Sequence, residues 1–190
     1  WAGLIASYHN ADILDAEAAG LTLVQTEEAI RTHQWHHNGD NQILLVVMGN
    51  NPSVSSTPKM QVAEALADRI NDLAVTMTGI HPLSVKGNYP VMRQPFEGFP
   101  MQPWEKLPMH LYRAHNWHCW GRKTREHYAS IYTSLGCPFD CYYCNIHALY
   151  EDRKVKFRPV KDILHELERL YHAGTLNLKI WDELFALDEN

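Results

Sequence analysis

Three cysteines in the middle of the chain carry its strongest chemical signal. Cys137, Cys141 and Cys144 fall within eight positions of a sequence that has 190 residues and four cysteines. Three thiolates on one loop can ligate three irons of a 4Fe–4S cube and leave the fourth iron for another ligand. The residue types and their spacing therefore predict an iron–sulfur site with one open coordination position.

Other kinds of site fit the same cysteines less well. A closed structural zinc site takes four protein ligands, usually in two well-separated pairs, and Cys119 or a histidine could complete such a set. A ferredoxin-type carrier needs a fourth cysteine and a closer spacing. Unligated core cysteines are the least favoured alternative, whereas a zinc site remains open.

Composition limits the class of partner. The chain is 45% hydrophobic and 21% charged, which is close to globular averages, so it can bury a packed core. Its formal net charge is −5, and its basic stretches, 122–125 and 154–158, are short. A solvated face explains such stretches at least as well as a nucleic-acid site, so we expect no nucleic-acid partner.

Cysteine clustering and hydropathy predict a cytoplasmic protein. Clustered thiols indicate a metal site in a reducing compartment rather than a disulfide framework. The longest apolar run, from Ile43 to Met48, has six residues, against the roughly 20 that cross a bilayer. We therefore expect no membrane span, and no secretory signal is visible.

The elements that must position these residues begin with alternating strand and helix signals. The unbroken apolar run 43–48 predicts a strand covered on both faces, and residues 73–80 predict a second strand. A helix is predicted between them, with Thr57 as its cap and Pro58 in its first position. Its apolar stripe consists of Val62, Leu66, Ile70 and Leu73. A thinner stripe predicts an earlier helix over residues 26–36, and the succession indicates an α/β unit with a parallel sheet.

The cysteine loop belongs to a second run of elements. The alternating stretch 128–135 predicts a strand with a polar face suited to a ligand cavity. Pro159 opens a helix that Gly174 ends, and residues 176–185 predict a further strand. The predicted apolar stripe of that helix consists of Val160, Ile163, Leu164, Leu167 and Leu170. Strand, loop, helix and strand form the first turn of a β/α barrel.

Three segments result from this pattern. Residues 1–85 form an α/β domain, and residues 128–190 form the start of the barrel. Between them, residues 86–127 are rich in proline and aromatic residues, which predicts an ordered linker that packs through aromatic contacts. We expect the chain to be a piece of a longer protein.

The cysteine loop resembles the signature of the radical S-adenosylmethionine superfamily. Its CxxxCxxC spacing has an aromatic residue, Tyr143, just before the last cysteine. Residues 132–141 and 179–185 resemble the cobalamin-binding branch of that superfamily. The resemblance implies that the open iron binds the amino and carboxylate groups of S-adenosylmethionine. An electron from the cluster then cleaves the C–S bond and gives a 5′-deoxyadenosyl radical.

The same resemblance suggests contacts to S-adenosylmethionine. Tyr143 would lie near the adenine. Asp182 and Glu183 sit where the superfamily often places a polar residue that holds the methionine ammonium group. A pair of solvated acids at a strand end explains Asp182 and Glu183 equally well.

The first segment resembles the cobalamin-binding domain that precedes the radical domain in this branch. Its polar loop, 49–57, follows a predicted strand and precedes a helix N-terminus, where open α/β sheets bind ligands. Taken alone, a polar loop with satisfied hydrogen bonds is the commoner explanation. With segments 15–22 and 79–82, the resemblance implies cobalamin contacts from Gly49, Asn50, Ser53, Ser55, Ser56, Thr57, Gly79 and His81.

Two features depart from the cobalamin pattern. The Asp-x-His-x-x-Gly motif, which supplies a histidine to cobalt in many other cobalamin proteins, is absent from the sequence, and radical members commonly lack it too. Residues 82–89 leave almost no room for the further helix and strand that the family has before the linker. We therefore expect a shortened sheet or a sequence that omits residues.

Together the resemblances imply a cobalamin-dependent radical S-adenosylmethionine methyltransferase. Its fold would be a Rossmann-like cobalamin-binding domain followed by the start of a radical S-adenosylmethionine β/α (partial TIM-type) barrel. Methylcobalamin would methylate an unactivated carbon of a small-molecule, lipid or natural-product substrate. An electron donor such as flavodoxin or ferredoxin would reduce the cluster.

Three other functions remain open. The same branch includes enzymes that rearrange, cyclise or contract a ring without methyl transfer. A methylthiotransferase acting on RNA would need a second cluster with about three more cysteines, and only Cys119 is left. A non-catalytic cobalamin or metal-binding module is the alternative of another class.

Overall fold

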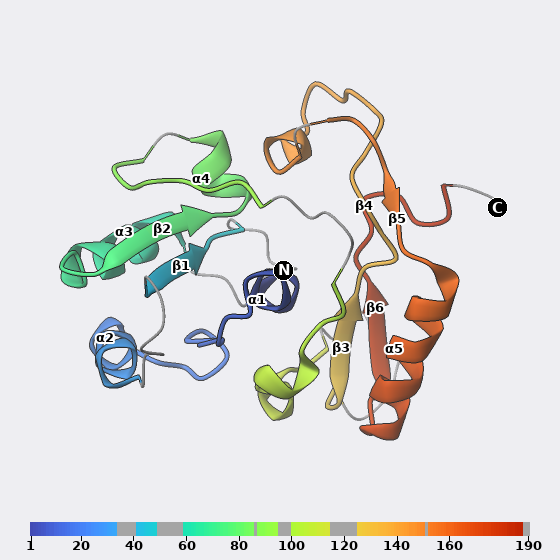
Figure 1. Cartoon of the computed structure of the whole chain (residues 1–190), viewed down its shortest axis with the longest axis horizontal. Coiled ribbons are helices and arrows are strands. Elements are labelled where there is room, and N and C mark those ends of the chain that lie inside the picture. The colour runs from blue at the N-terminus through green and yellow to red at the C-terminus, as the bar shows by residue number, and fades with distance from the viewer. Residues whose placement is uncertain are drawn as a thin grey trace. The chain divides into compact units, whose positions relative to one another are not determined.

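A computed structural model shows a mixed α/β protein (Figure 1). It describes residues 1–33, 41–48, 59–85, 87–94, 100–114, 125–150 and 152–187. The described residues form three two-stranded sheets, two of them parallel, and the chain falls into two compact units. The first unit comprises Trp1 and Leu14–Pro95, and the second comprises Ala2–Ile13 and Phe96–Asn190.

The first unit is built on a parallel pair of strands, as the sequence predicted. Strands β1 (Gln42–Val46) and β2 (Ala74–Thr78) pair in parallel, and helix α3 (Met60–Arg69) lies between them in the chain. Parallel neighbours need such a crossover connection. The helix α4 (Ile80–Ser84) and an isolated parallel bridge between Met77 and Val91 follow β2. The sequence predicted that residues 82–89 leave almost no room for a further helix and strand. In the structure, this part of the chain has one short helix and a single β-bridge.

The core of the first unit lies between α3, α2 and the strands. Its buried members are Ile30, Val47, Met60, Ala63, Leu66, Ala67, Ile70, Val75 and Met77. The predicted stripe of α3 was partly wrong, because Val62 is 38% exposed while Ala63 and Ala67 are buried. The small alanine side chains let the helix approach the sheet closely. The predicted cap Thr57 and first residue Pro58 lie outside the described residues.

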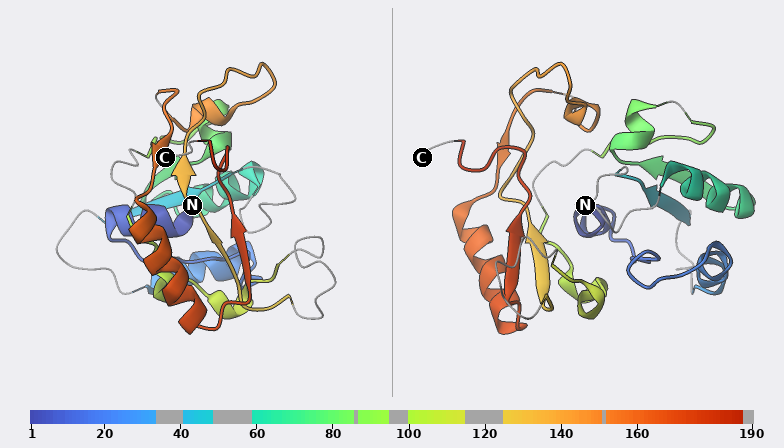
Figure 2. Two further views of the ribbon diagram at one scale, coloured as in Figure 1. Left: turned by 90° about the vertical axis from the view of Figure 1, so that its right-hand side faces the viewer. Right: turned by 180° about the vertical axis from the view of Figure 1, so that it is seen from behind.

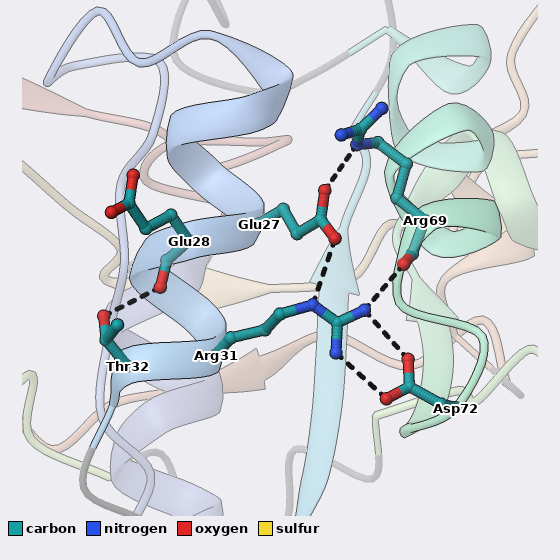
Figure 3. Close-up of polar contacts among 6 residues, drawn as sticks. All are labelled: Glu27, Glu28, Arg31, Thr32, Arg69 and Asp72. Carbon is teal, nitrogen blue, oxygen red and sulfur yellow. Dashed lines mark hydrogen bonds and ion pairs between the residues drawn. The ribbon is translucent and has the colours of Figure 1, made fainter.

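Helix α2 (Leu23–Thr32) confirms the earlier of the two predicted helices, with shifted ends. It begins with a capping box, in which the Thr22 hydroxyl accepts from the Gln25 N–H and the Gln25 side chain accepts from the Thr22 N–H. Two of its side chains, Glu27 and Arg31, join α2 to the end of α3 through ion pairs (Figure 3).

The second unit contains another parallel pair. Strands β3 (Tyr128–Ile131) and β6 (Asn177–Ile180) are parallel, and helix α5 (Val160–His172) connects them and lies alongside them in every view (Figure 2). Gly174 ends α5 with a φ of +84°, a conformation that glycine adopts readily. The predicted strand–helix–strand order is confirmed, whereas no barrel is formed by the part of the chain that the structure describes.

The predicted strand 128–135 is divided between two sheets. Its first part is β3, and its last two residues form β4 (Ser134–Leu135), which pairs in antiparallel fashion with β5 (Lys156–Phe157). The division falls at Thr133, whose N–H donates to the Asp182 carboxylate and whose carbonyl accepts from the Arg158 N–H. A side chain from elsewhere in the chain therefore interrupts the ladder. The strand predicted over 176–185 also stops early, at Ile180.

The buried face of α5 carries a charge that the pattern did not predict. Glu166 is fully buried and forms an ion pair with Arg158, which is 5% exposed. The Trp104 indole N–H donates a 2.9 Å hydrogen bond to the same carboxylate. The face of α5 that packs inward carries Ile163, Glu166, Leu167 and Leu170, so two other residues of the predicted apolar stripe, Val160 and Leu164, are 67% and 55% exposed.

The remaining elements are short. Helix α1 (Ala2–His9), which the sequence reading missed, belongs to the second unit. The 3₁₀ turns in the described residues are η1 (Trp104–Lys106), η2 (Met109–Leu111) and η4 (Ile146–Ala148). None of the helices in the described ranges is both long and apolar enough to cross a bilayer.

Candidate functional site

The cysteine loop of the second unit begins at the carboxyl end of its parallel strands (Figure 1). Strands β4 and β5 form the stem of this loop. Cys137 is half-buried at the start of the loop, whereas Cys141 and Cys144 are exposed, and all three are free thiols. The Cys144 N–H donates a 3.0 Å hydrogen bond to the Cys141 carbonyl oxygen, which closes a turn between the last two cysteines.

Gly136 fixes the point at which the loop begins. Its φ is +102°, and a Cβ at this position would lie 2.2 Å from the carbonyl oxygen of Lys154. No other residue fits, because the conformation and the close approach both exclude a side chain. The residue before Cys137 therefore packs against the backbone just before β5, the opposite strand of the stem.

The donor chemistry of the three cysteines fits an iron–sulfur site, whereas their present arrangement does not yet form one. Three free thiols on one loop are the donor set that an iron–sulfur cube with an open iron requires. Among the described residues, no group of three cysteine, histidine, aspartate or glutamate side chains is arranged to hold a metal ion. The donors fit a cluster, and binding one requires the exposed part of the loop to bring the three sulfurs together.

Two acidic side chains lie at the root of this loop. Asp182 accepts hydrogen bonds from the Thr133 N–H at 2.7 Å, from the Thr133 hydroxyl, and from the Ser134 hydroxyl at 3.0 Å. Glu183 accepts from the Gly136 N–H at 3.3 Å and from the Tyr150 hydroxyl at 3.2 Å. The structure thus brings both predicted acids from the end of β6 to the start of the cysteine loop.

The hydrogen-bond partners of these two acids carry no charge in the part of the chain that the structure describes. Among the described residues, the donors to Asp182 and Glu183 are backbone amides and hydroxyl groups, all of them neutral. Burial raises the pKa of Glu183 above its usual value, and the neighbouring Asp182 charge raises it further. Burial beside Glu183 also raises the pKa of Tyr150. This corner of the molecule therefore favours a positively charged group.

Asp182 also borders a cleft of about 260 Å³. The cleft is lined by Thr133, Ser134, Phe157, Arg158, Val160, Ile163, Asp182, Phe185 and Ala186. Four of these lining residues, Thr133, Ser134, Arg158 and Asp182, are polar or charged, and the other five are apolar. Small-molecule pockets usually span roughly 300–1,000 Å³, so the cleft can accept one end of a ligand rather than all of it.

Tyr143 lies with the cysteines at the exposed part of the loop. Its side chain is 78% exposed and packs edge to face against Tyr142, with ring centroids 5.3 Å apart. A hydrogen bond with Cys141 raises the pKa of the Tyr143 hydroxyl, and the charges of Cys141 and Cys144 act in the same direction. The hydroxyl is thus beside the thiols, and its place near an adenine stays a prediction.

Two contacts of the cysteine loop and of the residue just after it were not predicted from the sequence. Tyr150 donates to Glu183 across 33 positions of sequence, a separation at which no spacing rule operates. The His147 Nε2 lies 2.6 Å from the Phe139 carbonyl oxygen, and its buried Nδ1 has no hydrogen-bond partner in the described part of the chain. The one sequence feature that could have pointed to Tyr150 is its position, six residues after Cys144.

The structure describes two of the residues predicted to contact cobalamin. Gly79 and His81 lie at the carboxyl end of β2, and the His81 N–H donates to the Val47 carbonyl oxygen at 3.4 Å. A Cβ on Gly79 would lie 2.2 Å from that same oxygen, so strand packing alone explains the glycine. The other six, Gly49, Asn50, Ser53, Ser55, Ser56 and Thr57, lie outside the described residues.

Comparison with known proteins gives two distant relatives. The chain is 25% identical over 174 residues to a protein of Pyrococcus horikoshii named as an uncharacterized methyltransferase, covering 78% of this chain and 35% of that protein. It is 28% identical over 155 residues to the ribosomal protein uS12 methylthiotransferase RimO of Bradyrhizobium diazoefficiens, covering 76% of this chain and 34% of that protein. The chain therefore spans about a third of the length of each.

Other comparisons do not add to this result. No family model matches the chain, and no solved structure matches it. Both relatives carry the names of enzymes that transfer a methyl or methylthio group. The names thus point to an enzyme of this broad kind.

Proposed function

We propose that the chain carries the cluster-binding part of a cobalamin-dependent radical S-adenosylmethionine methyltransferase. The observation that carries this proposal is the cysteine loop at the carboxyl end of β3 and β6, with two acids at its root whose hydrogen-bond donors, among the described residues, are all neutral. Cys137, Cys141 and Cys144 would hold a 4Fe–4S cluster through their thiolates. When bound, the cluster supplies the electron that cleaves S-adenosylmethionine.

Asp182 and Glu183 would serve the cationic end of S-adenosylmethionine. Both the sulfonium and the ammonium of that molecule are positive, and in the described residues the hydrogen bonds to the two carboxylates come from neutral amides and hydroxyl groups. The cleft beside Asp182 is large enough for one end of the molecule. In this proposal the acids hold the methionine part while Tyr143, at the exposed part of the loop, lies toward the adenine.

The first unit would bind cobalamin at the carboxyl ends of its parallel strands. Gly79 and His81 lie at that edge of β2, and the loop 49–57 follows β1 in sequence. Open α/β sheets bind ligands at this edge. The protein's contribution would be to hold the cofactor and the substrate within reach of each other and to exclude water.

Replacing Cys141 with alanine in the full-length protein tests the cluster. We expect iron content and 5′-deoxyadenosine formation to fall to background, measured after anaerobic reconstitution. Cys119→Ala is the matched control, because Cys119 is the one cysteine outside the loop. If Cys119→Ala loses metal together with Cys141→Ala and the metal is zinc, the zinc alternative replaces this proposal.

A second candidate, a radical methylthiotransferase, is favoured by the similarity to RimO. That class needs a second cluster, and Cys119 is the one cysteine of this chain left to serve it. Iron analysis separates the two, since one cube gives about four irons per chain and two give about eight.

Isotope labelling separates the remaining alternatives. Methyl label from S-adenosylmethionine should appear in the product of a methyltransferase and not in that of a rearranging or ring-contracting enzyme. A reconstituted protein that does not cleave S-adenosylmethionine would support a non-catalytic binding module.

A further inference from the structure

One carboxylate receives hydrogen bonds from both ends of the cysteine loop. The Gly136 N–H, just before Cys137, donates to one oxygen of Glu183 at 3.3 Å. The Tyr150 hydroxyl, just after the loop, donates to the other oxygen at 3.2 Å. Glu183 itself comes from the end of β6, so a side chain outside the loop joins the two places where the loop begins and ends.

The anchoring points are closely packed, whereas the loop between them is exposed. Gly136 is held against the Lys154 carbonyl oxygen, and Leu149, next to Tyr150, is 2% exposed. Between these points Cys141 and Cys144 are exposed. The position of Cys137 relative to the other two thiols therefore depends on how firmly the two ends are joined.

The burial of Glu183 makes this junction stronger than a surface contact. Hydrogen bonds to an ionised carboxylate are about twice as strong as those between neutral groups, and a half-buried site screens them less. Burial raises the pKa of both Glu183 and Tyr150, which agrees with a hydrogen bond that is partly shielded from water. No other residue of the described chain reaches Glu183 in this way.

We propose that Tyr150 is a positioning residue, which acts through Glu183 to hold the two ends of the cysteine loop at a fixed separation. This arrangement sets how readily Cys137 meets Cys141 and Cys144 around a cluster. The statement about the cluster rests on the proposed function, whereas the junction of the loop ends is a property of the chain itself.

The first test needs no cluster. Tyr150→Phe in the full-length apo protein removes one hydroxyl, and the alkylation of each thiol by iodoacetamide is followed by mass spectrometry. We expect Cys137 to react roughly fivefold to tenfold faster, because it leaves its half-buried place more often. Cys141 and Cys144 should change by less than about twofold, since they are exposed already.

Tyr171→Phe is the matched control, because Tyr171 is 75% exposed on α5 and lies outside the loop. It should leave the reactivity of Cys137 unchanged. An unchanged Cys137 rate in a folded Tyr150→Phe protein overturns the proposal. Global unfolding of that variant, seen by circular dichroism, overturns it as well, since a local junction cannot govern the whole fold.

The second test concerns the cluster. In reconstituted protein, Tyr150→Phe should lose iron to a chelator about tenfold faster than wild type and should alter the electron paramagnetic resonance spectrum of the reduced cluster. If wild type binds no iron, the proposed function fails while the alkylation result still decides the junction. If wild type binds iron and Tyr150→Phe matches it in rate and spectrum, the junction does not position the cluster.

Discussion

Two groups of acidic residues in this protein differ in the partners of their carboxylates. On the first unit, Glu27 and Asp72 alternate with Arg31 and Arg69, and every charge meets an opposite one (Figure 3). On the second unit, Asp182 and Glu183 meet hydroxyls and amides and, in the described residues, no cation. The first group joins two helices, and the second stands beside the cysteine loop.

The pKa of Glu183 moves in the opposite direction from those of Glu27 and Asp72. Hydrogen bonds from Arg31 lower the pKa of Glu27 and of Asp72, and Arg69 lowers that of Glu27 further. Burial raises the pKa of Glu183. Ion pairs on a surface connect structural elements. A half-buried carboxylate that has only neutral partners is less stable in its ionised form, and a positively charged ligand would stabilise that form. The difference marks the second group as the candidate for binding.

A third acid, Glu166, sharpens the comparison by being both buried and balanced, and we expect it to give the largest effect. Glu166→Ala should lower the free energy of unfolding by about 3–5 kcal/mol, because Arg158 is left buried without its partner. Urea denaturation followed by tryptophan fluorescence measures the loss. Glu27→Ala is the control, and its transition should move far less. A loss below about 1 kcal/mol for Glu166→Ala would contradict the importance of this pair.

Asp182→Asn should give the next largest effect, on ligand affinity. The amide keeps the shape of the side chain but removes the charge, so the affinity of the cluster-loaded full-length protein for S-adenosylmethionine should fall about 10-fold to 100-fold. Equilibrium dialysis with labelled S-adenosylmethionine gives the dissociation constant. Asp72→Asn, from the balanced surface group, should leave it unchanged. Equal affinity in all three proteins would leave Asp182 as a solvated strand-end acid.

Glu183 and Glu27 should also respond to pH with opposite signs. A raised folded pKa means that Glu183 favours the folded state below its ordinary pKa of 4.5, and that this contribution is lost as the pH rises through the raised value. Glu27 has a lowered pKa, so its contribution is present above 4.5 and is lost as the pH falls through the lowered value. Carbon-13 NMR of labelled glutamates should show one carboxyl titrating above 4.5 that disappears in Glu183→Gln. Titration of that carboxyl below 4.5 would reverse the interpretation.

Arg31→Ala should have the smallest effect. Its partners Glu27 and Asp72 are at the surface, where solvent and salt screen ion pairs, so the melting temperature should move by no more than a few degrees. Iron content and S-adenosylmethionine cleavage should equal those of wild type. A loss of either would show that the surface group is coupled to the cysteine loop.

The sequence by itself determined the local features of this protein. The parallel strands around 43–48 and 73–80, the helix that Pro159 opens and Gly174 ends, and the clustering of three thiols were all readable. Each depends on residues near one another in the chain, where periodicity and the conformational preferences of proline and glycine act directly. The prediction of the cofactors and of the reaction came from a resemblance to a known family and not from these local features.

Only the tertiary structure decided which side chains meet across the chain. It divided the strand predicted over 128–135, because Asp182 takes the N–H of Thr133. It placed Glu166 rather than Leu164 in the core of the second unit, and it joined Tyr150 to Glu183 across 33 positions. Such pairings follow from the packing of whole elements, which no local pattern encodes, so polar partners distant in sequence become visible when the chain is folded.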